Sequence, residues 1–314
     1  MNERELRQLA DEIFEQLRRE KDGASNTALE LRRAVSSAPS HPRRLIRAVS
    51  PAPSHGAASS APSLKRRVAD FVDHTLLKAE ATHSEILKLC AEAAEHRFAA
   101  VCVNPTWVPL CVERLQGTGV KTCTVIGFPL GATTIRAKAA EAREAAASGA
   151  AEIDMVMAIG RAKSGDWGYV EDDIRAVVDA SRPSIVKVII ESAALSQDEI
   201  LKASALSKEA GARFVKTSTG FHSAGGASVD AVRLMKLVVG DDLEVKASGG
   251  VRDCATALAM IGAGASRIGT SSGAGMVSCL GPEPLSLAEL IAKPHLPAAT
   301  CSSGKCASAG GAQY

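Results

Sequence analysis

Two stretches decide the fold: RFVKTSTGF (213–221) and LEVKASGGVRD (243–253). Each begins with a short apolar run that carries a lysine, and each continues into a glycine-containing loop. Such runs, rich in Val and other apolar residues and bounded by turn residues, predict β-strands. Six further runs of this kind occur: FVDHT (71–75), AAVCVNP (99–105), KTCTVIGFP (121–129), AEIDMVMA (151–158), SIVKVIIE (184–191) and SRIGTSS (266–272).

Helical stretches lie between the predicted strands. SEILKLCAEAAEH (84–96) and AKAAEAREAAASG (137–149) are rich in helix formers, and Gly149 is a predicted C-cap. Alternating strands and helices fit either a doubly wound sheet or a barrel. Eight strands, each followed by a helix, within residues 66–295 have the order and size of a (β/α)8 barrel. We therefore predict an α/β fold of the TIM-barrel type.

The chain outside the barrel has a different composition. Residues 1–23 predict an amphipathic helix, because apolar residues recur at helical spacing: Leu6, Leu9, Ala10, Ile13, Phe14 and Leu17. Residues 24–65 contain the near-repeat AVSSAPSH and AVSPAPSH, which predicts a disordered low-complexity linker, with a short helix around TALELRRAV as the alternative. Residues 296–314 form a tail of Ala, Ser, Gly and Cys that we expect to be flexible.

Composition narrows the class of protein. The 314 residues carry a net charge of +2, which does not favour nucleic acid or an anionic membrane as a partner. No apolar run is long enough to span a bilayer and no secretory signal is evident, so we expect a cytoplasmic protein. The 8 cysteines form no CxxC pair and the histidines are scattered, so we expect buried, reduced thiols and no metal site.

Ionisable residues occupy several predicted strands. Lys216 and Lys246 lie on adjacent strands, and reactive groups of a barrel lie at the C-terminal strand ends. Two buried ammonium groups would each lower the other's pKa, which would leave one amine neutral and able to attack a carbonyl. The alternative is purely structural: these lysines and Lys187 would pair with Asp154 and Glu191 inside the barrel.

Glycine-rich loops follow the last predicted strands. SGGVRD (248–253) and GTSSG (269–273) stand where barrels of this type bind phosphate through backbone N–H groups and a helix N-terminus. TSTGF (217–221) adds a third such loop. Together the three loops predict a phosphorylated substrate.

Eight motifs, in this order, resemble the deoxyribose-phosphate aldolases over most of residues 66–295: DHTLLKAEAT (73–82), VCVNPTWVP (101–109), VIGFPLGATT (125–134), EIDMV (152–156), KVIIE (187–191), FVKTSTGF (214–221), VKASGGVRD (245–253) and GASRIGTSSG (264–273). The resemblance implies a class I aldolase that cleaves 2-deoxy-D-ribose 5-phosphate reversibly to D-glyceraldehyde 3-phosphate and acetaldehyde. It implies no metal and no organic cofactor, and we expect a homodimer.

The resemblance also implies roles for individual residues. Lys216 would form the Schiff base, Lys246 would perturb it and assist proton transfer, and Asp154 would act through water in the proton relay. The substrate pocket would be lined by Asp73, Cys102, Thr217 and the terminal Tyr314. Phosphate would be bound by Gly220, Ser248, Gly249, Gly250, Arg252, Ser271 and Ser272.

The front of the chain departs from the aldolase pattern. The helix of residues 1–23 and the linker behind it are similar to the encapsulation peptides of bacterial microcompartment enzymes, which implies a shell protein as partner. A self-association helix or a disordered appendage is the alternative. For the barrel, the rival functions are another phosphate-binding barrel enzyme and an inactive scaffolding barrel. The intact set of Asp154, Lys216 and Lys246 argues against the scaffold.

Overall fold

The computed structural model describes residues 65–292, together with residues 8, 12, 15 and 19. Eight parallel strands close into a barrel in which each strand pairs with its neighbours in the chain and β1 pairs with β8. The predicted (β/α)8 barrel is therefore confirmed. The strands are β1 (Val72–Leu76), β2 (Ala100–Val103), β3 (Lys121–Ile126), β4 (Glu152–Val156), β5 (Ile185–Ile189), β6 (Phe214–Lys216), β7 (Glu244–Ser248) and β8 (Arg267–Thr270).

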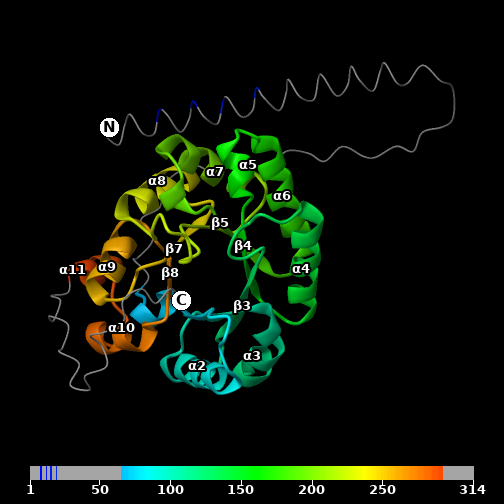
Figure 1. The fold of residues 1–314 in the computed structure, drawn as a ribbon. Coiled ribbons are helices and arrows are strands. Elements are labelled where there is room, and N and C mark those ends of the chain that lie inside the picture. The colour runs from blue at the N-terminus through cyan, green and yellow to red at the C-terminus, as the bar shows by residue number, and fades with distance from the viewer. Residues whose placement is uncertain (1–7, 9–11, 13–14, 16–18, 20–64, 293–314) are drawn as a thin grey trace, which may run out of the picture.

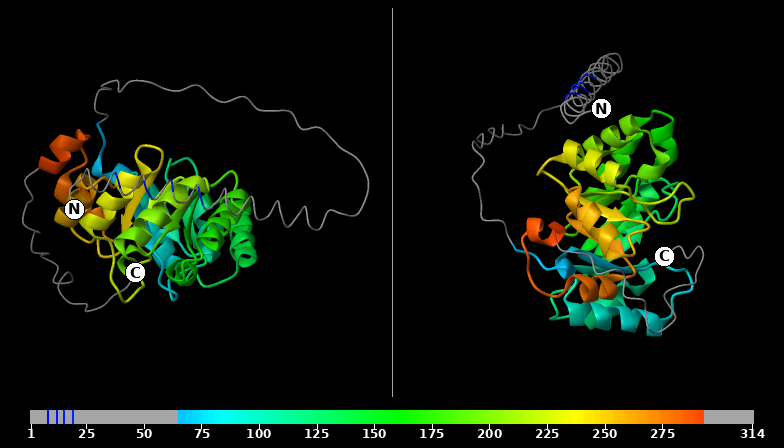
Figure 2. Two further views of the ribbon diagram at one scale, coloured as in Figure 1. Left: turned by 90° about the horizontal axis from the view of Figure 1, so that it is seen from above. Right: turned by 90° about the vertical axis from the view of Figure 1, so that its left-hand side faces the viewer.

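Helices surround the barrel on the outside (Figure 1), and two further views show the same arrangement (Figure 2). They are α2 (His83–His96), α3 (Val108–Leu115), α4 (Ile135–Ala147), α5 (Ile159–Lys163), α6 (Trp167–Ala180), α7 (Gln197–Glu209), α8 (Val229–Val239), α9 (Cys254–Gly262), α10 (Gly273–Leu280) and α11 (Leu287–Ala292). Short 3-10 turns are η1 (Val68–Phe71), η2 (Pro105–Trp107) and η3 (Ser192–Ala194).

Each observed strand lies inside its predicted run, except that β1 extends one residue further. The runs are longer than the strands because their ends continue into loops at the C-terminal face of the barrel. RFVKTST, for example, contributes only Phe214–Lys216 to β6, so Lys216 is the last residue of its strand. The loops that were predicted to hold the site therefore begin directly beyond Lys216 and Ser248.

Helix boundaries follow from capping residues. The Thr82 side chain accepts from the backbone of Glu85 in a capping box at the start of α2, and Asp253 accepts from Thr256 at the start of α9. Gly149 has φ +95° just after α4, a conformation that favours glycine, so the predicted stop signal is confirmed. Asp253 places the N-terminus of α9 directly behind the SGGVRD loop.

Strand side chains alternate between two environments. One set, including Ile153, Val188 and Val215, is fully buried against the helices and belongs to the main apolar core. The other set faces the inside of the barrel. There a small apolar cluster of Leu77, Ala100, Cys102, Cys123 and Val125 lies close to a group of charged side chains. This inner set forms the candidate site.

Little of the remaining chain is described. Gln8, Glu12, Glu15 and Arg19 are helical and exposed, and the other residues of the helix predicted over 1–23 lie outside the described residues. The apolar stripe of that helix, most of the predicted linker and the tail lie outside the described residues, so these domain limits stay predictions. Within the described part of the chain, no helix is long and apolar enough to cross a membrane.

Candidate active site

The interior of the barrel holds seven ionisable side chains, which we call the barrel cluster. Because side chains alternate along a strand, residues two apart face the same side. Glu152 and Asp154 on β4 show this spacing and both are fully buried. The members of the barrel cluster are Asp73, Glu152, Asp154, Lys187, Lys216, Lys246 and Arg267, and each is at most 8% exposed.

Asp154 stands at the centre of the barrel cluster. One carboxylate oxygen accepts from Nζ of Lys216 at 2.7 Å and from Nζ of Lys246 at 2.8 Å. The other accepts from Nζ of Lys187 at 2.8 Å. Burial alone would raise the pKa of Asp154, but the three ammonium groups hold it well below its ordinary value. Asp154 is therefore a carboxylate at neutral pH.

Lys246 lies between two carboxylates. Its Nζ donates to Asp73 at 2.5 Å as well as to Asp154. Burial lowers the pKa of Lys246, yet the two carboxylates outweigh burial and hold the pKa above its ordinary value. The expectation that Lys216 and Lys246 lower each other's pKa is therefore wrong for Lys246, because Asp73 and Asp154 offset the repulsion. Lys246 stays a cation.

A deeper layer of ion pairs supports these residues. Lys187 lies 2.6 Å from Glu152, and the guanidinium of Arg267 bonds to Asp73 at 2.6 Å and to Glu152 at 2.9 Å. Glu152 and Arg267 are not among the site residues predicted from the sequence. Their positions in the strands could have indicated them: Glu152 stands two residues before Asp154 on β4, and Arg267 is the first residue of β8.

The charges of the barrel cluster do not balance. Its three carboxylates (Asp73, Glu152 and Asp154) face four basic groups. Excess positive charge in a buried site favours loss of a proton or binding of an anion. Among the three lysines, Lys216 lies nearest the open end, since it is the last residue of β6 and its side chain keeps 3% exposure while those of Lys187 and Lys246 keep none. A ligand entering from that end meets Lys216 first.

The alternative prediction, that the lysines pair with Asp154 and Glu191 for purely structural reasons, is correct for Asp154 and wrong for Glu191. Asp154 does pair with the lysines, whereas Glu191 bonds to the backbone and hydroxyl of Thr219. Ion pairing and chemistry are therefore not exclusive here. The carboxylate that pairs with Lys216 is also the one within reach of any group bound to it.

An apolar wall with two thiols lies beside the barrel cluster. Cys123 donates to Asp154 at 3.1 Å, and Cys102 is fully buried next to it. The hydrogen bond to Cys123 lowers the pKa of Cys102. Phe128 and Phe221, which the sequence analysis did not single out, pack edge to face at 5.2 Å against this wall. The wall is apolar and lies directly beside the Asp154 carboxylate.

Glycine lets the loop between β6 and α8 approach the predicted phosphate loop SGGVRD, which follows β7. A Cβ on Gly226 would lie 2.1 Å from the carbonyl oxygen of Gly249, so only glycine fits there. Ala227 donates its N–H to the carbonyl oxygens of Ser248 and Gly249 at 3.1 and 3.0 Å. Gly220, Gly249 and Gly250 all have positive φ. The loops after β6 and β7 thus form one connected rim at the open end of the barrel.

Comparison with known proteins agrees with this geometry. The model of the DeoC/LacD family aldolases matches residues 67–279. The chain belongs to this family of aldolases. The chain is similar to the deoxyribose-phosphate aldolase of Streptococcus uberis, with 55% identity over 212 residues that cover 68% of this chain and 96% of the relative.

Two further relatives support the assignment. The deoxyribose-phosphate aldolase of Brevibacillus brevis is 58% identical over 208 residues, which cover 66% of this chain and 94% of the relative. The solved tetrameric deoxyribose phosphate aldolase of Aeropyrum pernix is 32% identical with a TM-score of 0.63, over 67% of this chain and 89% of that one. The family model begins at residue 67, so it does not cover the front of the chain.

The other predicted site residues of this aldolase fall in several places. The Thr217 hydroxyl donates to the backbone carbonyl of Ser248 and accepts from its N–H, so it joins β6 to β7. Arg252 and Ser271 are exposed and Ser272 is half-buried. Tyr314 lies outside the described residues.

Two groups in the aldolase barrel have a donor set that could hold a metal ion. Cys102, Cys123 and Asp154 bring their ligand atoms within 4.8 Å of one another, as do Asp73, Cys123 and Glu152. The sequence analysis expected no metal site. Ammonium and guanidinium groups already bind all three carboxylates, so this interior fits cations carried by side chains better than a further metal cation.

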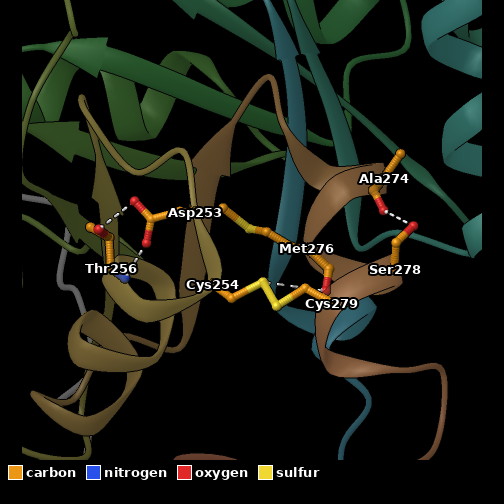
Figure 3. The surroundings of a disulfide bond; sticks show 7 residues. All are labelled: Asp253, Cys254, Thr256, Ala274, Met276, Ser278 and Cys279. Atoms are coloured by element: carbon orange, nitrogen blue, oxygen red, sulfur yellow. Dashed lines mark hydrogen bonds between the residues drawn. A yellow bond between two sulfur atoms is a disulfide. The ribbon is translucent and has the colours of Figure 1, made fainter. Parts of the chain in front are cut away.

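A disulfide joins the two helices that follow the predicted phosphate loops of the aldolase (Figure 3). It links Cys254, the first residue of α9, to Cys279 in α10, with their Cα atoms 6.6 Å apart. The expectation of reduced thiols is therefore wrong for this pair, which lies far apart in sequence and meets only in the fold. Cys90, Cys102, Cys111 and Cys123 are free and buried, as expected.

Proposed function

We propose that this aldolase cleaves 2-deoxy-D-ribose 5-phosphate reversibly to D-glyceraldehyde 3-phosphate and acetaldehyde, through a Schiff base on Lys216. One observation carries the proposal: Lys216 and Lys246 both bond to the same oxygen of Asp154, and Lys216 is the one at the open end. We infer the substrate from the relatives, which are named deoxyribose-phosphate aldolases. The three glycine loops at the rim supply a place for its phosphate.

The chemistry begins at the amine. The amine form of Lys216 attacks the C1 aldehyde of the open-chain sugar, and protonation and loss of water give an iminium ion. The iminium is the electron sink for cleavage of the C2–C3 bond. C3 becomes the aldehyde of the departing glyceraldehyde 3-phosphate, and an enamine of acetaldehyde remains on Lys216. Protonation of the enamine and addition of water release acetaldehyde and restore the amine.

Asp154 and Lys246 supply the proton transfers. The carboxylate and the ammonium group lie 2.8 Å apart, so a proton can pass between them, or through a water, to the reacting atoms. Lys246 donates a proton to the carbinolamine hydroxyl, which leaves as water. Asp154 accepts the proton of the C3 hydroxyl and passes it to the amine of Lys246, which then donates it to the enamine. Cys102 and the apolar wall would hold the acetaldehyde fragment away from bulk water.

Borohydride trapping tests the proposal directly. With acetaldehyde present, borohydride should leave a stable ethyl adduct on Lys216, and product analysis should detect glyceraldehyde 3-phosphate from the sugar phosphate with equal rates with and without EDTA. Of the rival barrel enzymes, an isomerase would give no adduct, and a different Schiff-base aldolase would give the adduct but release no glyceraldehyde 3-phosphate from this sugar. An adduct on a different lysine would refute the assignment of Lys216.

We expect Gly250→Val to weaken binding of the phosphate. Gly250 has φ +82° and open space around it, so the substitution acts through backbone strain and not through a clash. The Michaelis constant for the phosphorylated sugar should rise about tenfold, the cost of one lost charge-assisted hydrogen bond. The constant for unphosphorylated 2-deoxyribose should stay the same.

Gly240→Val is the matched control for that experiment. Gly240 also has positive φ and open space, but it follows α8 at the opposite end of the barrel. Steady-state kinetics on both sugars should show no selective loss for this variant. If Gly250→Val affected the two sugars equally, its loop would not bind the phosphate.

The proposal extends to assembly. A homodimer is expected, although the relative from Aeropyrum pernix is described as a tetramer. Residues 1–23 would bind a shell protein of a bacterial microcompartment by laying the apolar stripe into a groove. Enclosure suits a reaction that releases acetaldehyde, which is volatile and toxic. Light scattering would give the oligomeric state.

Deletion of residues 1–23 should leave the kinetic constants of the barrel unchanged within about twofold, because the matched family region begins only at residue 67. Residues 1–23 fused to a fluorescent protein should direct it into a shell in the native host. Microscopy and enzyme assays check both expectations. Diffuse fluorescence combined with lost activity would instead point to a helix docked on the barrel.

A further inference from the structure

Glu191 is a buried carboxylate that the proposed chemistry does not use. It lies two residues beyond the end of β5 and is 0% exposed, and its backbone has φ 56° and ψ 57°. Only two non-glycine residues of the described chain have positive φ. The other, Arg97, is the C-cap of α2, a common place for this conformation. Strain at a strand end beside a candidate site indicates a functional constraint.

The left-handed backbone aims the Glu191 side chain at the loop beyond Lys216. Both carboxylate oxygens accept from the N–H of Thr219, at 3.2 and 3.3 Å, and one accepts from its hydroxyl at 2.6 Å. The Thr219 hydroxyl in turn accepts from the N–H of Phe221 at 3.1 Å. Burial raises the pKa of Glu191 although the bonds from Thr219 oppose it.

These bonds fix both neighbours of Gly220. Gly220 has φ +87° and lies between Thr219 and Phe221, so the direction of its own N–H depends on the bonds that Glu191 makes. On the opposite side, Thr217 bonds to the backbone of Ser248, which starts the SGGVRD loop. The TSTGF loop is therefore held between Glu191 on one side and the SGGVRD loop on the other.

We propose that Glu191 is a positioning residue for the phosphate-binding backbone at Gly220, acting through Thr219 and not on the reacting carbon. The inference rests on the proposed function, since it assumes a phosphorylated sugar. The loop after β5 therefore contributes to substrate specificity, because the Glu191 carboxylate favours binding of the phosphorylated form of the sugar. The chemistry at Lys216 does not depend on this carboxylate.

The test compares two substrates in three variants. Glu191→Gln keeps the length of the side chain but loses acceptors. Thr219→Val removes the hydroxyl that links Glu191 to Phe221. For both, the Michaelis constant for 2-deoxyribose 5-phosphate should rise about tenfold while kcat, and kcat/KM for unphosphorylated 2-deoxyribose, change less than about twofold. The double variant should be no worse than either single one, because both act through one chain of bonds.

Glu191→Gly separates strain from the carboxylate, because glycine adopts positive φ without cost. It should show the same selective rise in the Michaelis constant even though its backbone is relaxed. Glu144→Gln, on the exposed face of α4, is the matched control and should behave as the parent protein. Borohydride trapping with acetaldehyde should label Lys216 equally in every variant.

Three results would overturn the inference: equal losses on both sugars, an unchanged Michaelis constant for the sugar phosphate, or additive effects in the double variant. The parent protein separates this from the proposed function. If the parent cleaved no 2-deoxyribose 5-phosphate, the proposed function would fail, and this inference with it. If the parent cleaved it well and the variants lost no selectivity, only the assignment of Glu191 would fail.

Discussion

Lys216→Arg should abolish turnover while the barrel stays folded. Arginine keeps a cation beside Asp154, so the ion pair that anchors this side chain survives. A guanidinium stays protonated and cannot form an imine with an aldehyde. We expect activity to fall by about 10⁴-fold or more, since the covalent route is removed entirely. Product release from 2-deoxyribose 5-phosphate measures this, and circular dichroism reports the fold.

Lys121→Arg is the matched control for this variant. Lys121 is the first residue of β3, and its Nζ lies 3.4 Å from Glu152 of the barrel cluster. Unlike Lys216, it lies at the N-terminal end of the barrel strands and its side chain is half exposed. The exchange of ammonium for guanidinium there should change kcat by no more than about twofold. Appreciable turnover by Lys216→Arg would refute the Schiff-base mechanism, whereas loss of activity in both variants would indicate a general structural effect.

The fold could be predicted from sequence because barrel strands carry a local signal. Each strand is buried on both faces, so it is a short apolar run that stands out between helical stretches. A lysine inside such a run, as in RFVKTST, is costly unless it is paired, and this made Lys216 and Lys246 conspicuous. Closure into a barrel followed from the number of strands.

The partners of these lysines could not be predicted in the same way. Which carboxylate meets which cation depends on the stagger of strands across the barrel, as for Lys246 and Asp73, which are 173 residues apart in the chain. The disulfide between Cys254 and Cys279 needs α9 and α10 to lie side by side, and no spacing rule reveals that. Glu191 was noticed, but its target, Thr219, depends on one left-handed residue.

Asp154→Asn should have the second large effect, on both activity and stability. Asparagine keeps the shape but removes the charge that three ammonium groups share. Two carboxylates would then face four cations, and removal of one partner of a buried pair costs about 3–5 kcal/mol. Turnover should also fall by roughly 10²–10⁴-fold, because the proton relay loses its base. Thermal unfolding and steady-state kinetics measure the two losses separately.

Asp173→Asn separates the loss of a buried charge from the loss of the relay. Asp173 is fully buried and binds Lys138 at 2.6 Å between α4 and α6, away from the barrel cluster. Burial outweighs Lys138 and raises the pKa of Asp173, whereas the pKa of Asp154 is lowered. The Asp173 charge is thus the less stabilised, so its removal should destabilise less and leave kcat unchanged.

The two variants should also respond differently to acid. The lowered pKa of Asp154 means that its stabilising contribution is present above its unfolded pKa, about 3.9, and is lost as pH falls below that value towards the folded one. Asp154→Asn should therefore flatten the acid limb of stability against pH, while Asp173→Asn, whose parent carboxyl has a raised pKa, should not. If both variants kept the parent's acid limb and kept full turnover, Asp154 would be neither the electrostatic centre of the barrel cluster nor part of the relay.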